Sequence, residues 1–168
     1  MPEELIELSE DWPTSYESYL KESFQGEVYG EAFFRTMAER CSNPEQAQKL
    51  RALEQLERET KEALRPAVRE AGLDAEDHPK RVVLGEKLGA KLAETPWGDL
   101  MQSLQAPIEK FTKAFERAES LAPPGKEALS KRVTAHERAI CGFVERELAG
   151  APDSLEPLLA VLEKPPTG

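Results

Sequence analysis

The sequence predicts an all-α protein built from four long helices, and three observations carry this prediction. Apolar residues recur at steps of three and four through residues 16–41, 50–71, 97–122 and 129–148, which is the period of a helix with one buried face. Caps, prolines and glycines that start or stop helices bound these segments. No stretch shows the apolar–polar alternation of a half-buried strand. The expected architecture is therefore a four-helix bundle.

The first helix is expected to begin after Thr14, which forms a capping box with Glu17, and to end near Arg40. Gly26 and Gly30 lie four residues apart inside it. A glycine within a helix costs about 1 kcal/mol relative to alanine. The pair therefore indicates a place where a neighbouring helix approaches closely.

The second helix is expected to begin at Pro44, with Asn43 as its cap. It should run to about Ala71, where Gly72 stops it. The connection between these two helices is so short that they must lie antiparallel.

Residues 73–94 carry a polar stretch followed by a weak helical pattern. About twenty residues are enough to cross the length of a bundle, so this segment is expected to be a long crossover between the second and third helices. Thr95 and Pro96 open the third helix, whose apolar stripe runs to Ala122.

The fourth helix is expected over residues 126–149, with Leu148 on its inward face. A short C-terminal helix is expected over residues 155–162. One domain of 1–168 follows from this chain length. Its expected parts are an N-terminal arm (1–13), a core (14–149), and the short C-terminal helix with its tail (150–168).

The composition limits the classes of partner. The formal net charge is −10, and Lys and Arg form no cluster; phosphate binding needs such clusters, so neither nucleic acid nor an anionic membrane is expected. Two Cys outside any CxxC pair favour a reducing compartment. No stretch approaches the ~20 apolar residues of a membrane span, and the first residues carry no signal-peptide pattern. A cytoplasmic protein is expected, and a homodimer and a small-molecule ligand stay open.

Carboxylates interrupt the apolar stripes near the middle of the predicted bundle. Glu27 and Glu31 lie on the stripe of the first helix and Glu57 on that of the second. His136 faces inward on the fourth helix, with Glu137 on its flank. A buried charged carboxylate is costly unless it is paired, protonated or bound to a metal. These five residues are therefore the candidate site.

The layout resembles the ferritin-like superfamily over residues 14–149, in helix order, crossover and inward glutamates. A di-iron or di-manganese site in such bundles uses one Glu from each of two helices and a Glu-x-x-His pair from each of the others. By this resemblance Glu27 or Glu31 matches the lone Glu of the first helix. Glu57 and Glu137 match the Glu of the two pairs.

Both pairs depart from that pattern. Thr60 and Ile140 stand where the two His belong, and the third helix offers only Glu109, which lies off its stripe. His136 is adjacent to Glu137 and is turned about 100° from it around the helix, so it does not simply replace the His that is missing at position 140. The resemblance implies iron or manganese, whereas the departures favour a bundle that keeps the frame without being an active di-iron enzyme.

Three interpretations stay open. In the first, the bundle is metal-free and Thr60, His136, Tyr or Arg side chains satisfy the glutamates. In the second, Glu27, Glu31 and Glu57 with His136 or Glu137 hold iron or manganese in a reduced or mononuclear site, as in a metal-dependent oxidase or hydroxylase; oxygen ligands with one imidazole suit these metals. In the third, the carboxylates line a small-molecule pocket that reads a cationic ligand, or the bundle binds a protein.

Overall fold

The apolar stripes fold into helices, which confirms the all-α prediction. A computed structural model describes residues 10–166, and these hold helices, turns and loops without a strand. The elements are α1 (Tyr16–Arg40), α2 (Pro44–Glu70), α3 (Pro79–Leu92), α4 (Trp97–Ala118), the 3-10 turn η1 (Glu119–Leu121), α5 (Glu127–Leu148) and α6 (Glu156–Leu159).

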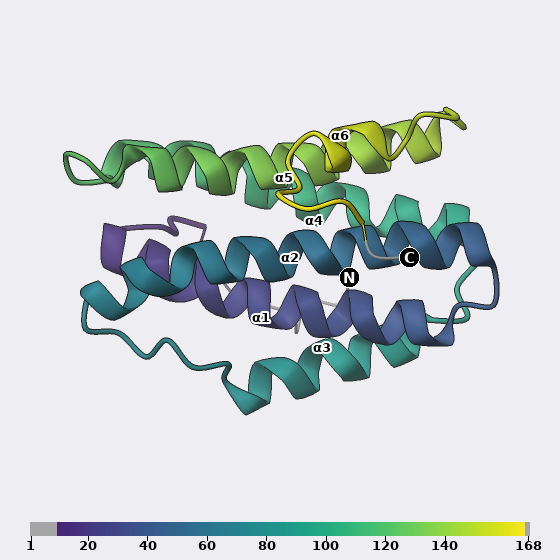
Figure 1. The fold of residues 1–168 in the computed structure, drawn as a ribbon, viewed down its shortest axis with the longest axis horizontal. Helices are drawn as coiled ribbons and strands as arrows, with labels where there is room; N and C mark the ends of the chain where they lie inside the picture. The colour runs from purple at the N-terminus through teal and green to yellow at the C-terminus, as the bar shows by residue number, and fades with distance from the viewer. Residues whose placement is uncertain (1–9, 167–168) are drawn as a thin grey trace.

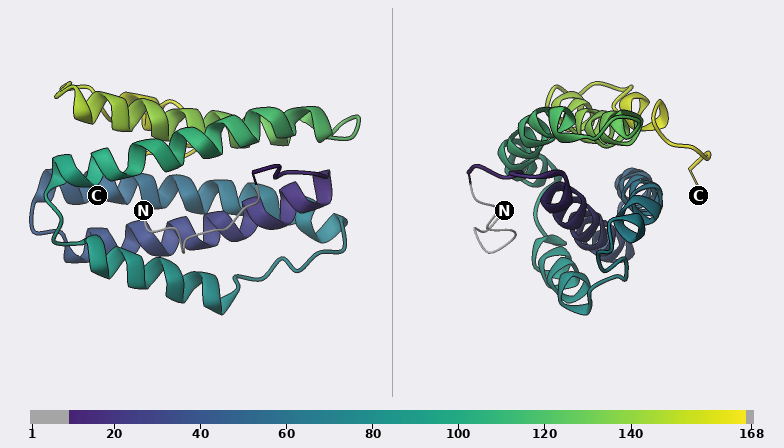
Figure 2. Two further views of the ribbon diagram at one scale, coloured as in Figure 1. Left: turned by 180° about the vertical axis from the view of Figure 1, so that it is seen from behind. Right: turned by 90° about the vertical axis from the view of Figure 1, so that its left-hand side faces the viewer.

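The long helices α1, α2, α4 and α5 lie roughly along one axis (Figures 1 and 2). The chain runs one way in α1 and α5 and the opposite way in α2 and α4. α1 packs closely against α2 and α3, and α4 packs against α5, whereas the backbones of α1 and α4 stay apart. This looser α1–α4 interface matters for the candidate site.

The segment expected to be a crossover contains a 14-residue helix, α3, that packs along α1. Two glycines explain how closely it packs. A Cβ at Gly89 would lie 2.8 Å from the Phe33 carbonyl oxygen, and one at Gly85 would lie 3.0 Å from the Phe33 nitrogen. The weak apolar pattern of 79–92 reflects a helix with only one narrow buried face, formed by Gly85, Leu88 and Gly89.

The start of α1 differs from the prediction by one residue. Ser15, not Thr14, is the cap: the Ser18 N–H donates to Ser15 Oγ at 3.0 Å. Ser15 has the extended backbone that a cap requires (φ −151°, ψ 160°). The expected cap of α2 is confirmed, because the Gln46 N–H donates to Asn43 Oδ1 at 3.1 Å.

The second hairpin shows three smaller differences. α4 begins at Trp97 with Pro96 as its cap, so Thr95 does not cap it. Its α-helical part ends at Ala118, before the expected Ala122. Leu148 is 37% exposed and not inward, because α5 ends at this residue.

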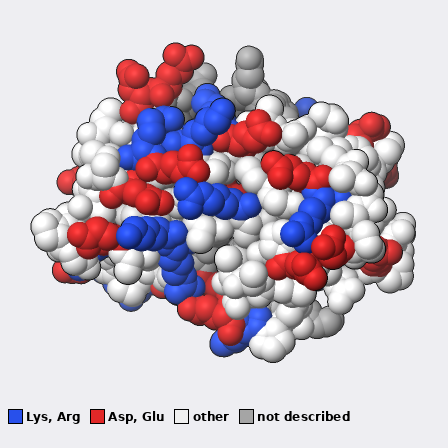
Figure 3. Space-filling model, turned by 90° about the horizontal axis from the view of Figure 1, so that it is seen from above, with Lys and Arg blue, Asp and Glu red and all other residues white. Residues whose placement is uncertain are grey.

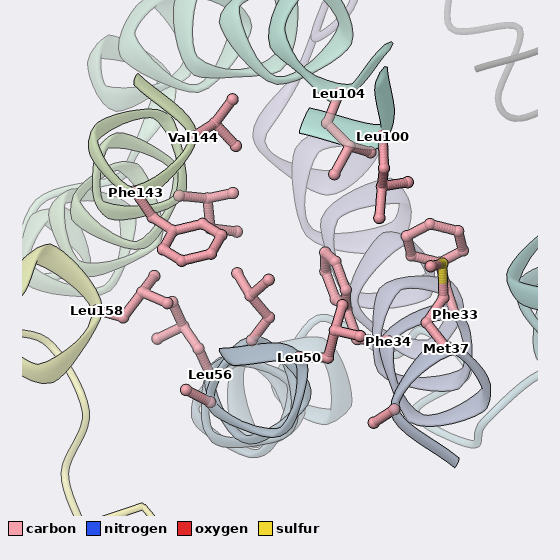
Figure 4. Close-up of a cluster of buried hydrophobic side chains, with 14 of the residues drawn as sticks. Phe33, Phe34, Met37, Leu50, Leu56, Leu100, Leu104, Phe143, Val144 and Leu158 are labelled. Atoms are coloured by element: carbon pink, nitrogen blue, oxygen red, sulfur yellow. The ribbon is translucent and has the colours of Figure 1, made fainter. Parts of the chain in front are cut away.

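Large apolar side chains from the six α-helices of residues 10–166 meet in the core. In Figure 4, Phe33, Phe34 and Met37 of α1 point towards the space between the helices, as do Phe143 and Val144 of α5. The set labelled there also includes Leu50, Leu56, Leu100, Leu104 and Leu158. A second cluster lies nearer the start of α1, where Trp12 packs edge-on against Phe115 with ring centroids 5.6 Å apart. The expected arm is therefore partly seen, while residues 1–9 lie outside the described residues.

Ion pairs are frequent on the surface. Figure 3 shows acidic and basic side chains interspersed over the upper face of the molecule. Arg138 pairs with Glu116 at 3.0 Å, and Arg146 pairs with Asp153 at 3.0 Å. Within residues 10–166, no helix combines the length and apolar character needed to cross a membrane.

One buried carboxylate ties four elements together at the end of the bundle. Glu147 of α5 accepts hydrogen bonds from Lys49 of α2 and from Trp97 of α4, each at 2.6 Å, and from the Ser154 hydroxyl ahead of α6. Burial alone would raise the pKa of Glu147, but these donors outweigh it and lower the pKa below its usual value.

A depressed pKa in the folded state stabilises the fold above the unfolded-state value, about 4.3, and this stabilisation is lost as the pH falls through the lower folded value. We expect Glu147→Gln to lose about 1–3 kcal/mol of unfolding free energy at pH 7, and less as the pH falls towards 3. Urea denaturation at the two pH values measures this. Glu45→Gln, which removes the exposed partner of Lys49, is the control and should change stability by less than about 0.5 kcal/mol. Equal losses of unfolding free energy in Glu147→Gln and Glu45→Gln would contradict the stabilising role assigned to Glu147.

Candidate functional site

Three buried side chains from three helices converge in the middle of the bundle. His136 Nε2 of α5 lies 3.7 Å from Glu27 Oε2 of α1 and 3.5 Å from Glu57 Oε1 of α2. One ligand atom from each residue lies within 4.8 Å of the other two. Glu137 Oε1 lies 3.9 Å from the same His136 nitrogen. The structure thus brings together four of the five residues that the sequence singled out.

Gly30 explains how Glu57 reaches this position. A Cβ at Gly30 would lie 2.6 Å from Glu57 Cδ and closer still to one carboxylate oxygen. Only glycine leaves room for the carboxylate against α1. The close approach expected at Gly30 is present, and the group that approaches is the Glu57 side chain. Gly26 makes no such approach, because a Cβ there would meet nothing within 4 Å.

Thr60 fixes the orientation of His136. The Thr60 hydroxyl lies 2.5 Å from His136 Nδ1, so the imidazole is held at one nitrogen and presents Nε2 to the acids. Metal-binding histidines are oriented in this way, with the second nitrogen hydrogen-bonded to a neighbouring group. The sequence placed Thr60 where a second-helix His would belong; its structural position is behind the imidazole.

The converging polar atoms lack partners. Glu27 Oε2 and His136 Nε2 are buried and have no hydrogen-bond partner in the part of the chain that the structure describes. Among residues 10–166, no Lys or Arg forms an ion pair with Glu27, Glu57 or Glu137. Most buried polar atoms in proteins are paired. Within residues 10–166, three neighbouring acids therefore share one imidazole as their only basic partner.

This environment shifts the protonation equilibria. Burial and then the Glu57 carboxylate raise the pKa of Glu27 well above its usual value. Burial raises the pKa of Glu137 to about 7, although His136 opposes the shift. Burial alone would lower the pKa of His136, but the carboxylates of Glu57 and Glu137 outweigh it and raise this pKa. In each case the cluster takes up protons in place of a missing positive charge.

Glu31, the fifth candidate, lies outside the cluster. Its carboxylate accepts from Arg58 Nε at 3.0 Å and from Lys61 Nζ at 2.5 Å, and Lys61 also pairs with Asp77. Four residues along a helix correspond to 400°, so Glu31 is turned about 40° from Glu27. That rotation, and the two cations on α2, direct it into an ion-pair network. Glu109 of α4 is exposed and does not reach the cluster.

A cavity of about 100 Å³ adjoins the acids on the α1–α4 side. Its walls are mostly aromatic and aliphatic, and it is partly open to solvent. Glu27, Glu57 and Glu137 are among its lining residues, as are Ser23 and Tyr29, whose buried hydroxyls have no hydrogen-bond partner within residues 10–166. Neither hydroxyl was predicted from the sequence. Ser23 lies one turn before Glu27, a spacing that could have placed it on the same face.

Comparison of the chain with known protein families, with curated proteins and with solved structures found no match.

Because Glu137 has a raised pKa in the folded state, the metal-free protein should lose stability as the pH rises from about 4.5 through about 7. We expect Glu137→Gln to flatten this part of the profile and to be more stable than the parent at pH 8, by about 1–2 kcal/mol. Thermal melts in chelator from pH 5 to 8 measure the effect. Glu145→Gln, at an exposed position on the same helix, is the control and should keep the parental slope. A Glu137→Gln profile as steep as that of the parent would show that this carboxyl titrates normally.

Proposed function

We propose that this protein binds one divalent iron or manganese ion through Glu27, Glu57 and His136, with Glu137 beside them. The observation that carries the proposal is the convergence of two unpartnered, buried ligand atoms, Glu27 Oε2 and His136 Nε2, with a third ligand atom from Glu57 inside 4.8 Å. A cation at their centre would satisfy all three.

The separations suit one ion. Ligand atoms that bind an ion at about 2.1 Å lie about 3.4 Å apart when the angle between them is tetrahedral. The distances of 3.5 and 3.7 Å from His136 Nε2 to Glu57 and Glu27 are close to this value. Oxygen-rich sites with one imidazole suit iron and manganese more than thiolate-preferring metals.

The number of candidate ligands in the cluster supports one bound ion better than two. A di-iron site of the ferritin-like type needs four carboxylates and two imidazoles, whereas this cluster has three carboxylates and one imidazole. The order and directions of α1, α2, α4 and α5 support the resemblance to that superfamily (Figure 1). Bound iron or manganese would supply redox chemistry with O2. The residues of this chain would hold the ion and orient its imidazole ligand through Thr60.

Metal content after anaerobic incubation with Fe(II) or Mn(II), followed by desalting, tests this proposal. We expect about one ion per chain for the parent protein. Glu27→Gln should lose at least tenfold in affinity, because an amide is a much weaker ligand than a carboxylate. Glu31→Gln is the matched control: it lies one turn along the same helix and is buried, but it pairs with Lys61, so it should keep the ion.

Two ions per chain would contradict a mononuclear site. No ion in the parent would favour the metal-free bundle. Loss of the ion in Glu31→Gln but not in Glu27→Gln would show that the wrong glutamate had been assigned.

A further inference from the structure

The cavity beside the acid cluster is better defined than a packing defect. Ser23, Tyr29 and Glu27 line it, and within residues 10–166 the hydroxyls of the first two have no hydrogen-bond partner. These residues are only 2%, 6% and 2% exposed, respectively. Buried polar atoms without partners are costly. The proposed ion would satisfy Glu27, but the two hydroxyls remain, and they indicate that a ligand with a polar group belongs there.

Gly26 keeps this space open. Gly30, Gly85 and Gly89 each sit where a Cβ would collide with a neighbour, but Gly26 meets nothing within 4 Å. It lies in the middle of α1 and lines the cavity. An alanine there would favour the helix by about 1 kcal/mol and would fit sterically. Packing therefore does not explain this glycine, whereas an open cavity does.

The charge of the cavity selects the class of ligand. Within residues 10–166 no Lys or Arg lines it, but Glu22, Glu27, Glu57 and Glu137 do, and of these four only Glu22 pairs with a Lys or Arg, namely Arg81. If a divalent ion binds the cluster, three carboxylates still leave one negative charge uncompensated. A ligand with a single positive charge balances it, and an anionic ligand is excluded.

The side chains that line the cavity determine which uncharged part of a ligand fits there. Rings of Trp12, Tyr29, Phe33, Phe111 and Phe115 are among the lining groups, and aromatic rings attract ammonium groups as well as apolar bodies. One water needs about 10–15 Å³ of such space, so about 100 Å³ holds a molecule the size of one substituted ring. We propose that this cavity binds a small primary amine with an apolar body, its ammonium group directed at Glu27, Ser23 and Tyr29.

This inference rests on the proposed metal site for its charge balance, and its test separates the two. The probe is benzylamine, which is positively charged at neutral pH as other primary alkylamines are. Benzyl alcohol is its neutral counterpart of similar shape. Calorimetric titration of Mn(II)-incubated protein, with tryptophan fluorescence of a Trp97→Phe background as a second readout and manganese content measured on the same samples, gives both results.

We expect benzylamine to bind at least tenfold more tightly than benzyl alcohol. Gly26→Leu should fill the cavity and weaken benzylamine binding at least tenfold without changing the manganese content. Gly98→Leu, which alters an exposed helical glycine outside the cavity and also meets nothing within 4 Å, is the matched control. Tyr29→Phe keeps the ring but removes a hydroxyl, and should weaken benzylamine binding three- to tenfold with little effect on benzyl alcohol.

Equal affinities for amine and alcohol would overturn the charge assignment. Absence of benzylamine binding, or binding unchanged in both Gly26→Leu and Tyr29→Phe, would overturn the cavity assignment. Benzylamine binding without bound manganese would leave the amine site standing and refute the metal proposal.

Discussion

A cluster of buried acids without a lysine or arginine partner is the main constraint on this structure. Glu27, Glu57 and Glu137 meet around His136 in the middle of the bundle, and no Lys or Arg of residues 10–166 pairs with them. Removing charges from water costs several kcal/mol per ion unless something compensates them. The fold meets this cost through proton uptake, seen in the raised pKa values of Glu27 and Glu137. A bound cation would meet it more fully.

Other buried acids of the protein have their negative charge compensated by Lys or Arg side chains. Glu31 has Lys61 and Arg58, Glu54 has Arg51 and Arg58, and Glu147 has Lys49. The chain therefore supplies basic partners where an acid has a structural role, on either side of the central cluster. Their absence at the centre, together with an imidazole oriented by Thr60, distinguishes the cluster from an ordinary ion-pair network.

Much of the fold could be predicted because it depends on local patterns. The apolar period located the four long helices, and Asn43 with Pro44 located the start of α2. The packing of α3 along α1 could not be predicted, since it depends on which backbone Gly85 and Gly89 meet. Glu27 and Glu31 show the same limit within the site. Both lie on one stripe, and the rotation of about 40° between them, together with the positions of Lys61 and Arg58 in space, decides that Glu31 and not Glu27 pairs with these two cations.

The cavity follows from the arrangement of helices and not from any motif. α1 packs closely on α2 and α3 but its backbone stays apart from α4, and Gly26 adds to the space between them. The hydroxyls of Ser23 and Tyr29 become informative only when their missing partners are seen. Metal site and cavity share Glu27 and Glu57, so an ion and a ligand bound there would lie side by side.

Anomalous diffraction from crystals of the protein grown with Mn(II) tests the central claim most directly. We expect one manganese peak per chain, between Glu27, Glu57 and His136 Nε2, at about 2.0–2.3 Å from their ligand atoms. A fully ordered cluster without a peak, or a peak beside Glu31 or at the surface alone, would contradict it.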